Sequence, residues 1–169
     1  MKSIILIGMP SCGKSTLGVL LAKRMGARFL DSDLLIQEKE GKLLHEIIAE
    51  RGSMGFLAIE NEVNRSIRDT NAVIATGGSV VYCEEAMKHL RTLGKVVYLK
   101  IPFSVMRERL GDYSHRGVVS PKGGTLEELY EERVALYEAY ADLTVDVSAA
   151  QLSDSLEKIC AALACDETK

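Results

Sequence analysis

The sequence has no excess of positive charge and no long hydrophobic run. Its 169 residues include 21 Lys and Arg against 24 Asp and Glu, a formal net charge of −3, so we expect no basic surface that would collect nucleic acid or bind an anionic membrane. No apolar stretch approaches the length that spans a bilayer, and Met1-Lys2 leads into the first predicted strand without the features of a signal peptide. We therefore expect a cytoplasmic monomer whose partner is a small molecule, with neither nucleic acid nor membrane as a partner.

The sequence also lacks a metal-binding pattern of cysteines. The spacings of Cys12, Cys83, Cys160 and Cys165 match no zinc site, and reduced thiols suit an intracellular protein. Cys12 is two residues from a lysine and could be an acidified, oxidisable thiol, although a small residue tolerated in a turn is the favoured interpretation. Internal repeats, low-complexity tracts and linkers are missing too, so residues 1–169 are expected to form one domain.

What the sequence does contain is a loop suited to holding phosphates. In the stretch IILIGMPSCGKSTLG, residues Gly8, Gly13, Lys14 and Ser15 fill the pattern G-x-x-x-x-G-K-[ST]. The glycines turn backbone N–H groups onto phosphate oxygens, while the lysine, expected to be solvated, adds positive charge and the serine hydroxyl binds Mg²⁺. An apolar run precedes the loop and a helical pattern follows it, as this mechanism requires. The residues expected to bind the nucleotide from this loop are Gly8, Ser11, Cys12, Gly13, Lys14, Ser15 and Thr16.

Apolar strands alternate with amphipathic helices along the whole chain, which predicts an α/β fold with a parallel sheet covered on both faces. Five strands are expected, at residues 2–7, 27–31, 72–76, 95–101 and 143–147. Some forty residues rich in helix formers separate the second strand from the third, more than one crossover helix uses. The surplus predicts a substrate-binding subregion at about 33–68. The glycine-rich, aperiodic stretch 111–125 is typical of a mobile lid, with a plain surface loop as the alternative.

Two aspartates at a strand end bear on which phosphate chemistry the loop serves. Two later apolar strands end at Lys100 and at Thr76, so neither supplies the aspartate that many NTPases hold beside Mg²⁺. Asp31 and Asp33 stand two apart after the second strand, and they share one face if the strand geometry continues. One acid can then serve Mg²⁺ while the other meets an acceptor hydroxyl; helix capping is the alternative role. The guanine-reading motif N-K-x-D is absent, which argues against a GTPase.

The order of these motifs resembles that of the shikimate kinases, within the nucleoside-monophosphate-kinase-like branch of P-loop folds. The resemblance covers nearly the whole chain: GMPSCGKST, DSD, GFLAIENEV where the family typically has G-F-R-x-x-E, and ATGGS where it typically has A-T-G-G-G. It continues through RERLGDYSHRG at the lid and EERVALYEAYADLTVDV, which looks like the family's late R-x-x-x-Y-x-x-x-A-D segment. It implies a three-layer P-loop kinase fold with a helical substrate-binding subregion and a lid. The implied reaction moves the γ-phosphoryl of ATP, with Mg²⁺, to a ring hydroxyl of a small carboxylated polyol, shikimate in the first place.

The resemblance also implies roles for catalytic and metal-binding residues. Lys14 and Ser15 match residues that bind phosphate and Mg²⁺, and Asp31 acts through the metal site. Asp33 holds the acceptor hydroxyl and deprotonates it, and Arg116 is the lid arginine that closes over the phosphates. A lysine, a metal, a mobile arginine and one aspartate form a sufficient set, because phosphoryl transfer depends on positioning and charge neutralisation.

Further implied roles concern adenine and the acceptor. Arg109 matches the arginine that lies against adenine, and Arg133 matches the one that grips the substrate carboxylate. Gly77 and Gly78 offer backbone N–H groups to the substrate, with Ser79 next to them. Without the resemblance, each arginine is better interpreted as a solvated surface charge.

The sequence departs from the family pattern on the acceptor side. Leu57 replaces the substrate-binding arginine of F-R-x-x-E, Ser79 replaces the third glycine of A-T-G-G-G, and RGVV (116–119) replaces R-P-L-L. An arginine–carboxylate bond is worth roughly 1.5 to 3 kcal/mol, or on the order of 10- to 150-fold in affinity. The loss of this bond is enough to change which acceptor the protein prefers, unless Arg51 or Arg65 compensates.

Two alternatives therefore accompany the shikimate kinase prediction. A related P-loop kinase for another small metabolite or sugar acid is the second candidate, because of Leu57. A nucleotide-binding regulator without turnover is the third, and the retained Lys14, Ser15, Asp31 and Asp33 argue against it.

Overall fold

The chain folds around a five-stranded parallel sheet. The computed structural model describes residues 2–111 and 118–167. The strands, in the order β2-β3-β1-β4-β5 across the sheet, are β1 (Ser3–Gly8), β2 (Arg28–Asp31), β3 (Ala72–Ala75), β4 (Gly94–Lys100) and β5 (Leu143–Asp146). All five predicted strands are present, with ends within one residue of the predicted ones.

The central strands form the core because helices cover both of their faces. Every residue of β1 and of β3 is buried, as expected for an apolar run in a parallel sheet. The register places Ile5 beside Ile74 on one side and beside Val96 on the other. The predicted α/β fold with a covered parallel sheet is therefore confirmed.

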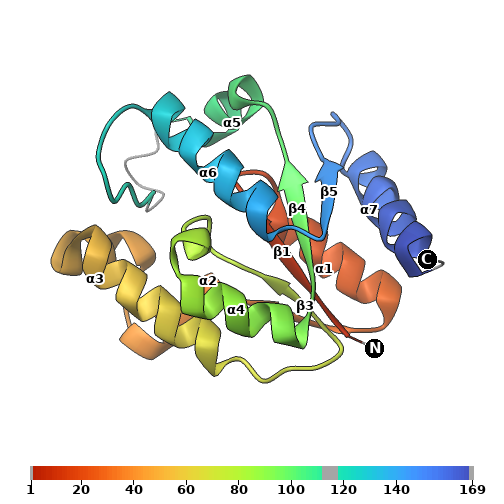
Figure 1. The fold of residues 1–169 in the computed structure, drawn as a ribbon, viewed down its shortest axis with the longest axis horizontal. Helices are drawn as coiled ribbons and strands as arrows, with labels where there is room; N and C mark the ends of the chain where they lie inside the picture. The colour runs from red at the N-terminus through yellow and green to blue at the C-terminus, as the bar shows by residue number, and fades with distance from the viewer. Residues whose placement is uncertain (1, 112–117, 168–169) are drawn as a thin grey trace.

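Helices lie on both sides of the sheet (Figure 1). They are α1 (Lys14–Met25), α2 (Ser32–Glu40), α3 (Leu44–Ser66), α4 (Glu84–Leu93), α5 (Phe103–Leu110), α6 (Leu126–Tyr140) and α7 (Leu152–Glu167), with one 3₁₀ turn, η1 (Val80–Tyr82). Helices α1 and α7 contact each other on one side, and α4 and α6 pack against β1 and β4 on the other. The arrangement has the three layers that the sequence predicts.

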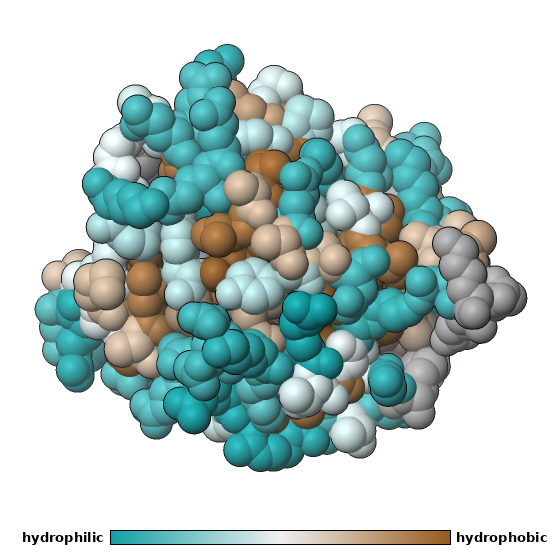
Figure 2. All heavy atoms as spheres, viewed as in Figure 1, coloured by the Kyte–Doolittle hydropathy of each residue, from teal (hydrophilic) through white to brown (hydrophobic). Residues whose placement is uncertain are grey.

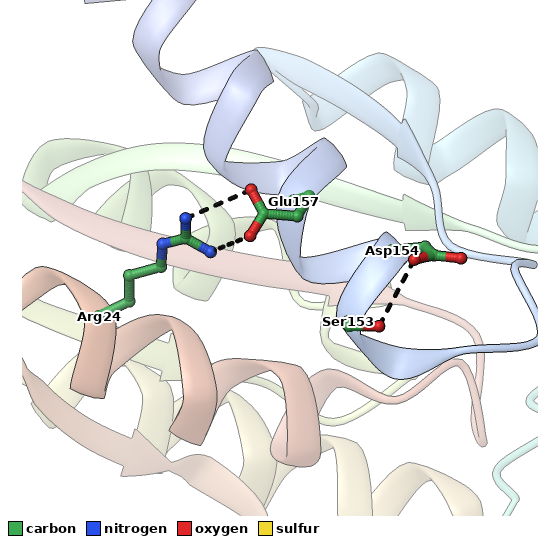
Figure 3. A network of polar contacts seen from close by, with 4 residues as sticks. All are labelled: Arg24, Ser153, Asp154 and Glu157. Carbon is green, nitrogen blue, oxygen red and sulfur yellow. Dashed lines mark hydrogen bonds and ion pairs between the residues drawn. The ribbon is translucent and has the colours of Figure 1, made fainter.

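An ion pair fastens the last helix to the first. Arg24 near the end of α1 reaches Glu157 of α7 with both of its terminal nitrogens (Figure 3). The hydrogen bond between Ser153 and Asp154 lies at the start of α7, away from this pair. Since both side chains of the ion pair are about half exposed or more, we expect its contribution to stability to be small.

Two helices, α2 and α3, occupy the long segment between β2 and β3. Helix α3 packs against α2 and α4, and its regular geometry is interrupted at Gly52, whose φ is 68°. A left-handed φ of this kind is readily adopted by glycine, so the interruption divides the helix into two arms. These helices occupy the segment in which the sequence predicts a surplus of helical residues.

The predicted lid segment is described only in part. Residues 112–117 lie outside the described residues, and 118–125 lead into α6. The start of α6 is fixed by a capping box, in which Thr125 accepts from the Glu128 N–H and Glu128 accepts from the Thr125 N–H. Residues 118–125 therefore lead directly into a helix whose first turn is capped by side chains.

Hydrophilic residues cover most of the molecular face seen in Figure 2, and hydrophobic ones gather in a smaller area near its middle. Across residues 2–111 and 118–167, no helix is both long enough and apolar enough to cross a membrane.

Candidate active site

The loop between β1 and α1 has the conformation that phosphate binding needs. Gly8 has a φ of 150°, and a Cβ atom there would lie 2.6 Å from the Leu99 carbonyl oxygen. Ser11 and Gly13 have φ values of 62° and 99°, so the backbone turns sharply before α1 begins. These turns leave the first N–H groups of α1 at the end of the loop, where a helix favours anions.

Lys14 is not the solvated lysine that the sequence analysis expects. Its side chain is buried, and its Nζ donates hydrogen bonds of 2.8 Å to the carbonyl oxygens of Gly8 and Met9. The ammonium group therefore lies over the loop and holds the turn closed. A bound phosphate would compete with these carbonyls for the same cation.

Cys12 is buried within the loop rather than exposed to oxidants. Its backbone N–H donates to the Met9 carbonyl oxygen at 3.2 Å, and its Sγ lies 3.8 Å from Lys14 Nζ. This arrangement agrees with the favoured interpretation of a small residue filling the turn.

Ser15 and Asp31 form the part of the site that suits Mg²⁺. The Ser15 hydroxyl donates a 2.6 Å hydrogen bond to Asp31 Oδ2, which joins α1 to the end of β2. A hydroxyl and a carboxylate are the hard oxygen donors that this ion prefers, and Mg²⁺ usually completes its shell with water and substrate phosphates. Within the described residues no group of three or more His, Cys, Asp or Glu side chains could hold a metal.

Asp31 and Asp33 do not share a strand face, and that geometric expectation is wrong. Strand β2 ends at Asp31 because its Oδ1 accepts the Asp33 N–H at 3.0 Å and caps α2. Asp33 is therefore the second residue of a helix. Its side chain nevertheless borders the cavity described below. Asp31 therefore lies beside Ser15 at the position that suits a metal, and Asp33 lies where an acceptor could bind.

The environment of Asp33 disfavours its charged form. Burial, and secondly the carboxylate of Asp31, raise the pKa of Asp33 to about 6, while Lys14 acts in the opposite direction. Its Oδ1 is buried and has no hydrogen-bond partner among the described residues. An unpartnered carboxyl oxygen beside a cavity is suited to receive a hydrogen bond from a ligand hydroxyl.

A cavity of about 560 Å³ connects these groups. From the loop and α1 it is lined by Pro10, Ser11, Gly13, Lys14, Ser15 and Thr16. The remaining lining residues are Asp33, Leu44, Phe56, Thr76, Gly77, Gly78, Ser79 and Arg109. The structure thus brings most of the predicted nucleotide and acceptor residues around one space, including the arginine predicted to lie against adenine.

The segment after β3 closes the acceptor side of the cavity. The Gly77 N–H donates to the Ser32 hydroxyl at 3.3 Å, and the Gly78 carbonyl accepts from the Tyr137 hydroxyl at 2.5 Å. A Cβ atom on Gly77 would lie 2.3 Å from Glu60 Oε1 and 2.8 Å from Asp33 Oδ1. A larger residue at position 77 would therefore force at least one of these two carboxyl groups to move.

Arg133 lies behind this segment rather than on the cavity wall. It is 1% exposed, donates from Nη2 to the Val119 carbonyl oxygen, and its guanidinium carbon lies 5.4 Å from the centre of the Tyr82 ring. A Cβ atom on Gly78 would lie 3.1 Å from Arg133 Nη1. The arginine therefore reaches the predicted substrate segment from the far side.

The position that lacks the family's arginine and the two arginines that could compensate for it lie in different surroundings. Leu57 is buried in the hydrophobic core, and its carbonyl oxygen accepts from the Cys83 thiol at 3.4 Å. Arg51 and Arg65 have exposed side chains, and neither is among the described residues that line the cavity. Arg116 lies outside the described residues.

Glu60, which lies beside the cavity, is a charged residue to which the sequence alone gave no role. It is fully buried beside the acceptor segment, and its Oε2 accepts a 2.6 Å hydrogen bond from the Ser79 hydroxyl. The signal was present in GFLAIENEV, because Glu60 is the acid of the family's G-F-R-x-x-E motif and follows Leu57 by nearly one helical turn.

Comparisons with known proteins agree with this geometry. A sequence model of the family described as shikimate kinase matches residues 10–164. A shikimate kinase of Francisella tularensis subsp. novicida is 37% identical over 162 residues, covering 94% of this chain and 92% of that protein. One of Persephonella marina is 34% identical over 146 residues, covering 86% and 88%. The solved structure of shikimate kinase from Acinetobacter baumannii in complex with shikimate has a TM-score of 0.88 and 29% identity, and the match covers 100% of this chain and 96% of that one.

Proposed function

Because the chain belongs to the shikimate kinase family, we propose that it transfers the γ-phosphoryl group of ATP to a hydroxyl of shikimate, giving shikimate 3-phosphate and ADP. The chain is accordingly a phosphotransferase with an alcohol as acceptor. The related kinase for another metabolite or sugar acid is not favoured by the comparisons, since the two relatives and the solved structure described above are named shikimate kinases.

One observation carries the proposal most directly. The carboxyl group of Asp33 borders the same cavity as the phosphate loop on one side and Gly77 and Gly78 on the other. A nucleotide on the loop and a polyol against the glycines would therefore present γ-phosphate and hydroxyl to each other. Phosphoryl transfer depends chiefly on such positioning and on charge neutralisation.

Asp33 supports proton removal from the acceptor. With a pKa of about 6 it is mostly ionised at neutral pH, so it can accept the hydroxyl proton as the acceptor oxygen bonds to the γ-phosphorus. In the same step the bond between that phosphorus and the bridging oxygen breaks, and ADP leaves with the electron pair. A carboxylate with a pKa near the working pH is effective in this role.

The cations proposed for the phosphates are Lys14, Arg116 and Mg²⁺. Lys14 would exchange its contacts with the Gly8 and Met9 carbonyls for phosphate oxygens. Ser15 and Asp31 would hold Mg²⁺, which neutralises phosphate charge when it is bound. Arg116 lies outside the described residues, so its closure over the phosphates stays a prediction.

We also propose the broader organisation that the sequence predicts. Residues 1–169 act as one domain, with 33–68 as the acceptor-binding subregion and 111–125 as the lid. Asp33, Leu44 and Phe56 support the first assignment because all three line the cavity. The cytoplasmic location, the monomeric state and the lack of a nucleic-acid or membrane partner stay predictions of the sequence.

The test is an ADP-release assay with ATP and Mg²⁺ over a panel of polyol and sugar acids. We expect shikimate to give the highest kcat/KM. ATP binding without turnover of any acceptor would support a regulator instead, and a higher kcat/KM for another acid would identify a different acceptor.

A further inference from the structure

Two departures from the family pattern, Leu57 and Ser79, both concern one buried carboxyl group. Ser79 donates its hydroxyl proton to Glu60 Oε2 at 2.6 Å. Leu57 stands three residues before Glu60 in α3, and side chains with this spacing are neighbours on one helix face. An arginine at position 57 would therefore lie within reach of Glu60. In this chain the leucine offers no charge, and the serine offers a hydroxyl where the family typically has glycine.

Glu60 has a place in the site that requires a fixed orientation. It is fully buried, and its Oε1 lies against Gly77 without a hydrogen-bond partner in the described part of the chain. The same point beside Gly77 is approached by Asp33 Oδ1, the unpartnered oxygen proposed to meet the acceptor hydroxyl. A rotation of Glu60 would move the glycine segment, the aspartate, or both.

Three charged side chains, from three helices, face Glu60. Asp33 of α2 disfavours its ionisation, while Lys14 of α1 and Arg133 of α6 favour it. The Cys83 thiol at the start of α4 also faces Glu60. Burial is the largest effect and raises the pKa of Glu60 to about 8, while the hydrogen bond from Ser79 is the second largest and lowers this pKa. The group is therefore largely protonated and uncharged at neutral pH, and it does not repel an acceptor carboxylate.

We propose that Ser79 takes the place of the missing arginine as the partner of Glu60, and that it is a positioning residue which holds Glu60 and Gly77 in the geometry that the acceptor requires. The identity of the acceptor rests on the function proposed above, whereas the pairing itself rests on the contacts of Glu60. The chain thereby keeps an oriented acceptor segment without a second arginine. Leu57 and Ser79 are a compensating pair, so each should matter more when the other is changed.

The test is a double-mutant cycle on Leu57→Arg and Ser79→Gly, which together restore the family pattern. Ser79→Gly alone should raise KM for shikimate about tenfold and leave KM for ATP within about twofold. In the Leu57→Arg background the same change should have little effect, because the arginine now holds Glu60. If Ser79→Gly raises KM for shikimate by the same factor in the unaltered chain and in Leu57→Arg, the proposed compensation is wrong.

Ser3→Ala is the matched control for the loss of a buried serine hydroxyl. Ser3 is fully buried, its hydroxyl donates to the Asp69 carbonyl oxygen, and it lies at the opposite end of β1 from the site. If Ser3→Ala lowers the melting temperature as Ser79→Gly does but leaves KM for shikimate unchanged, the effect at Ser79 is one of positioning. A comparable rise in KM in the control would show that lowered stability explains it.

A second measurement does not depend on the acceptor. The carboxyl carbon of Glu60, assigned by its disappearance in Glu60→Gln, can be followed by ¹³C NMR across pH in the full-length protein without ligands. Ser79→Gly should raise the titration midpoint because a donor to the anion is lost, and Leu57→Arg should lower it by about one unit or more. A midpoint that neither change moves would overturn the pairing. If it moves as expected but no variant phosphorylates shikimate, the pairing stands and the proposed acceptor is wrong.

Discussion

The Ser15 hydroxyl donates to Asp31 Oδ2, while Asp31 Oδ1 accepts the N–H of Asp33. One carboxylate therefore links the start of α1 to the start of α2. The link places the proposed metal position on one side of Asp31 and the proposed base, Asp33, on the other. Its geometry makes the two roles separable by substitution.

Asp31→Asn should raise the Mg²⁺ concentration for half-maximal turnover about tenfold, because a neutral amide is a poorer ligand for a hard cation. Asparagine caps helices about as well as aspartate, so the melting temperature should change little. The measurement is shikimate-dependent ADP release over a Mg²⁺ titration. An unchanged Mg²⁺ requirement would remove Asp31 from the metal site.

Lys14→Ala should lower kcat by about 100-fold or more, since it removes a charge that stabilises the transition state. It should also lower stability by about 1 to 2 kcal/mol, because two hydrogen bonds to the Gly8 and Met9 carbonyls are lost. Kinetics and thermal unfolding of the same sample separate the two effects. Full turnover in the folded variant would contradict the kinase proposal.

Asp33→Asn should lower kcat severely and leave ATP affinity nearly unchanged, because the proposed contact is to the acceptor. In the unaltered chain the rate should fall as pH drops through about 6, where the raised pKa of Asp33 lies. The measurement is kcat against pH together with ATP binding. A comparable loss of ATP binding in Asp33→Asn would place this residue in the metal site instead.

Glu60 should make the folded state less stable as pH rises. Its pKa is raised from 4.5 to about 8 in the folded chain, so the folded state binds more protons than the unfolded state between these values. The free energy of unfolding should then fall with pH by up to about 1.4 kcal/mol per unit. Chemical unfolding of Glu60→Gln between pH 5 and about 8 should lack this component; an identical slope would mean that Glu60 ionises normally.

Most of the fold could be predicted because strands and phosphate loops leave local signals. The apolar run before Gly8 and the glycine pattern after it specify β1 and the loop in a few adjacent residues. The strand ends were predicted to within one residue. The cap of α2 by Asp31 could be given from the sequence only as an alternative role, because it depends on one side-chain rotamer.

The candidate site was harder to predict because its contacts join distant segments. Ser79 and Glu60 are nineteen residues apart and meet only when the segment around η1 packs against α3. The burial of Lys14 likewise depends on where its ammonium folds back. The residue type at a single position gives no information about such pairings. The motif GFLAIENEV nevertheless marked the helical segment that contains Glu60.

Arg133 provides the sharpest test of how the acceptor is held. If its guanidinium is the main partner of the substrate carboxylate, Arg133→Ala should raise KM for shikimate by roughly 10- to 150-fold. A buried arginine that contacts Val119 and Tyr82 also supports the structure, so the loss alone does not prove the contact. Comparison with the neutral methyl ester of shikimate separates the two, because only the acid can use the charge.

The unaltered chain should prefer shikimate to its ester, and Arg133→Ala should erase most of that preference. Adding Leu57→Arg to this variant should restore part of it, since the new cation would lie three residues from Glu60 in α3, and Glu60 lies beside the acceptor segment. A structural role alone would reduce turnover of acid and ester by the same factor. That equal loss, in a variant that still binds ATP, would remove Arg133 from the carboxylate site and require another cation for the acceptor.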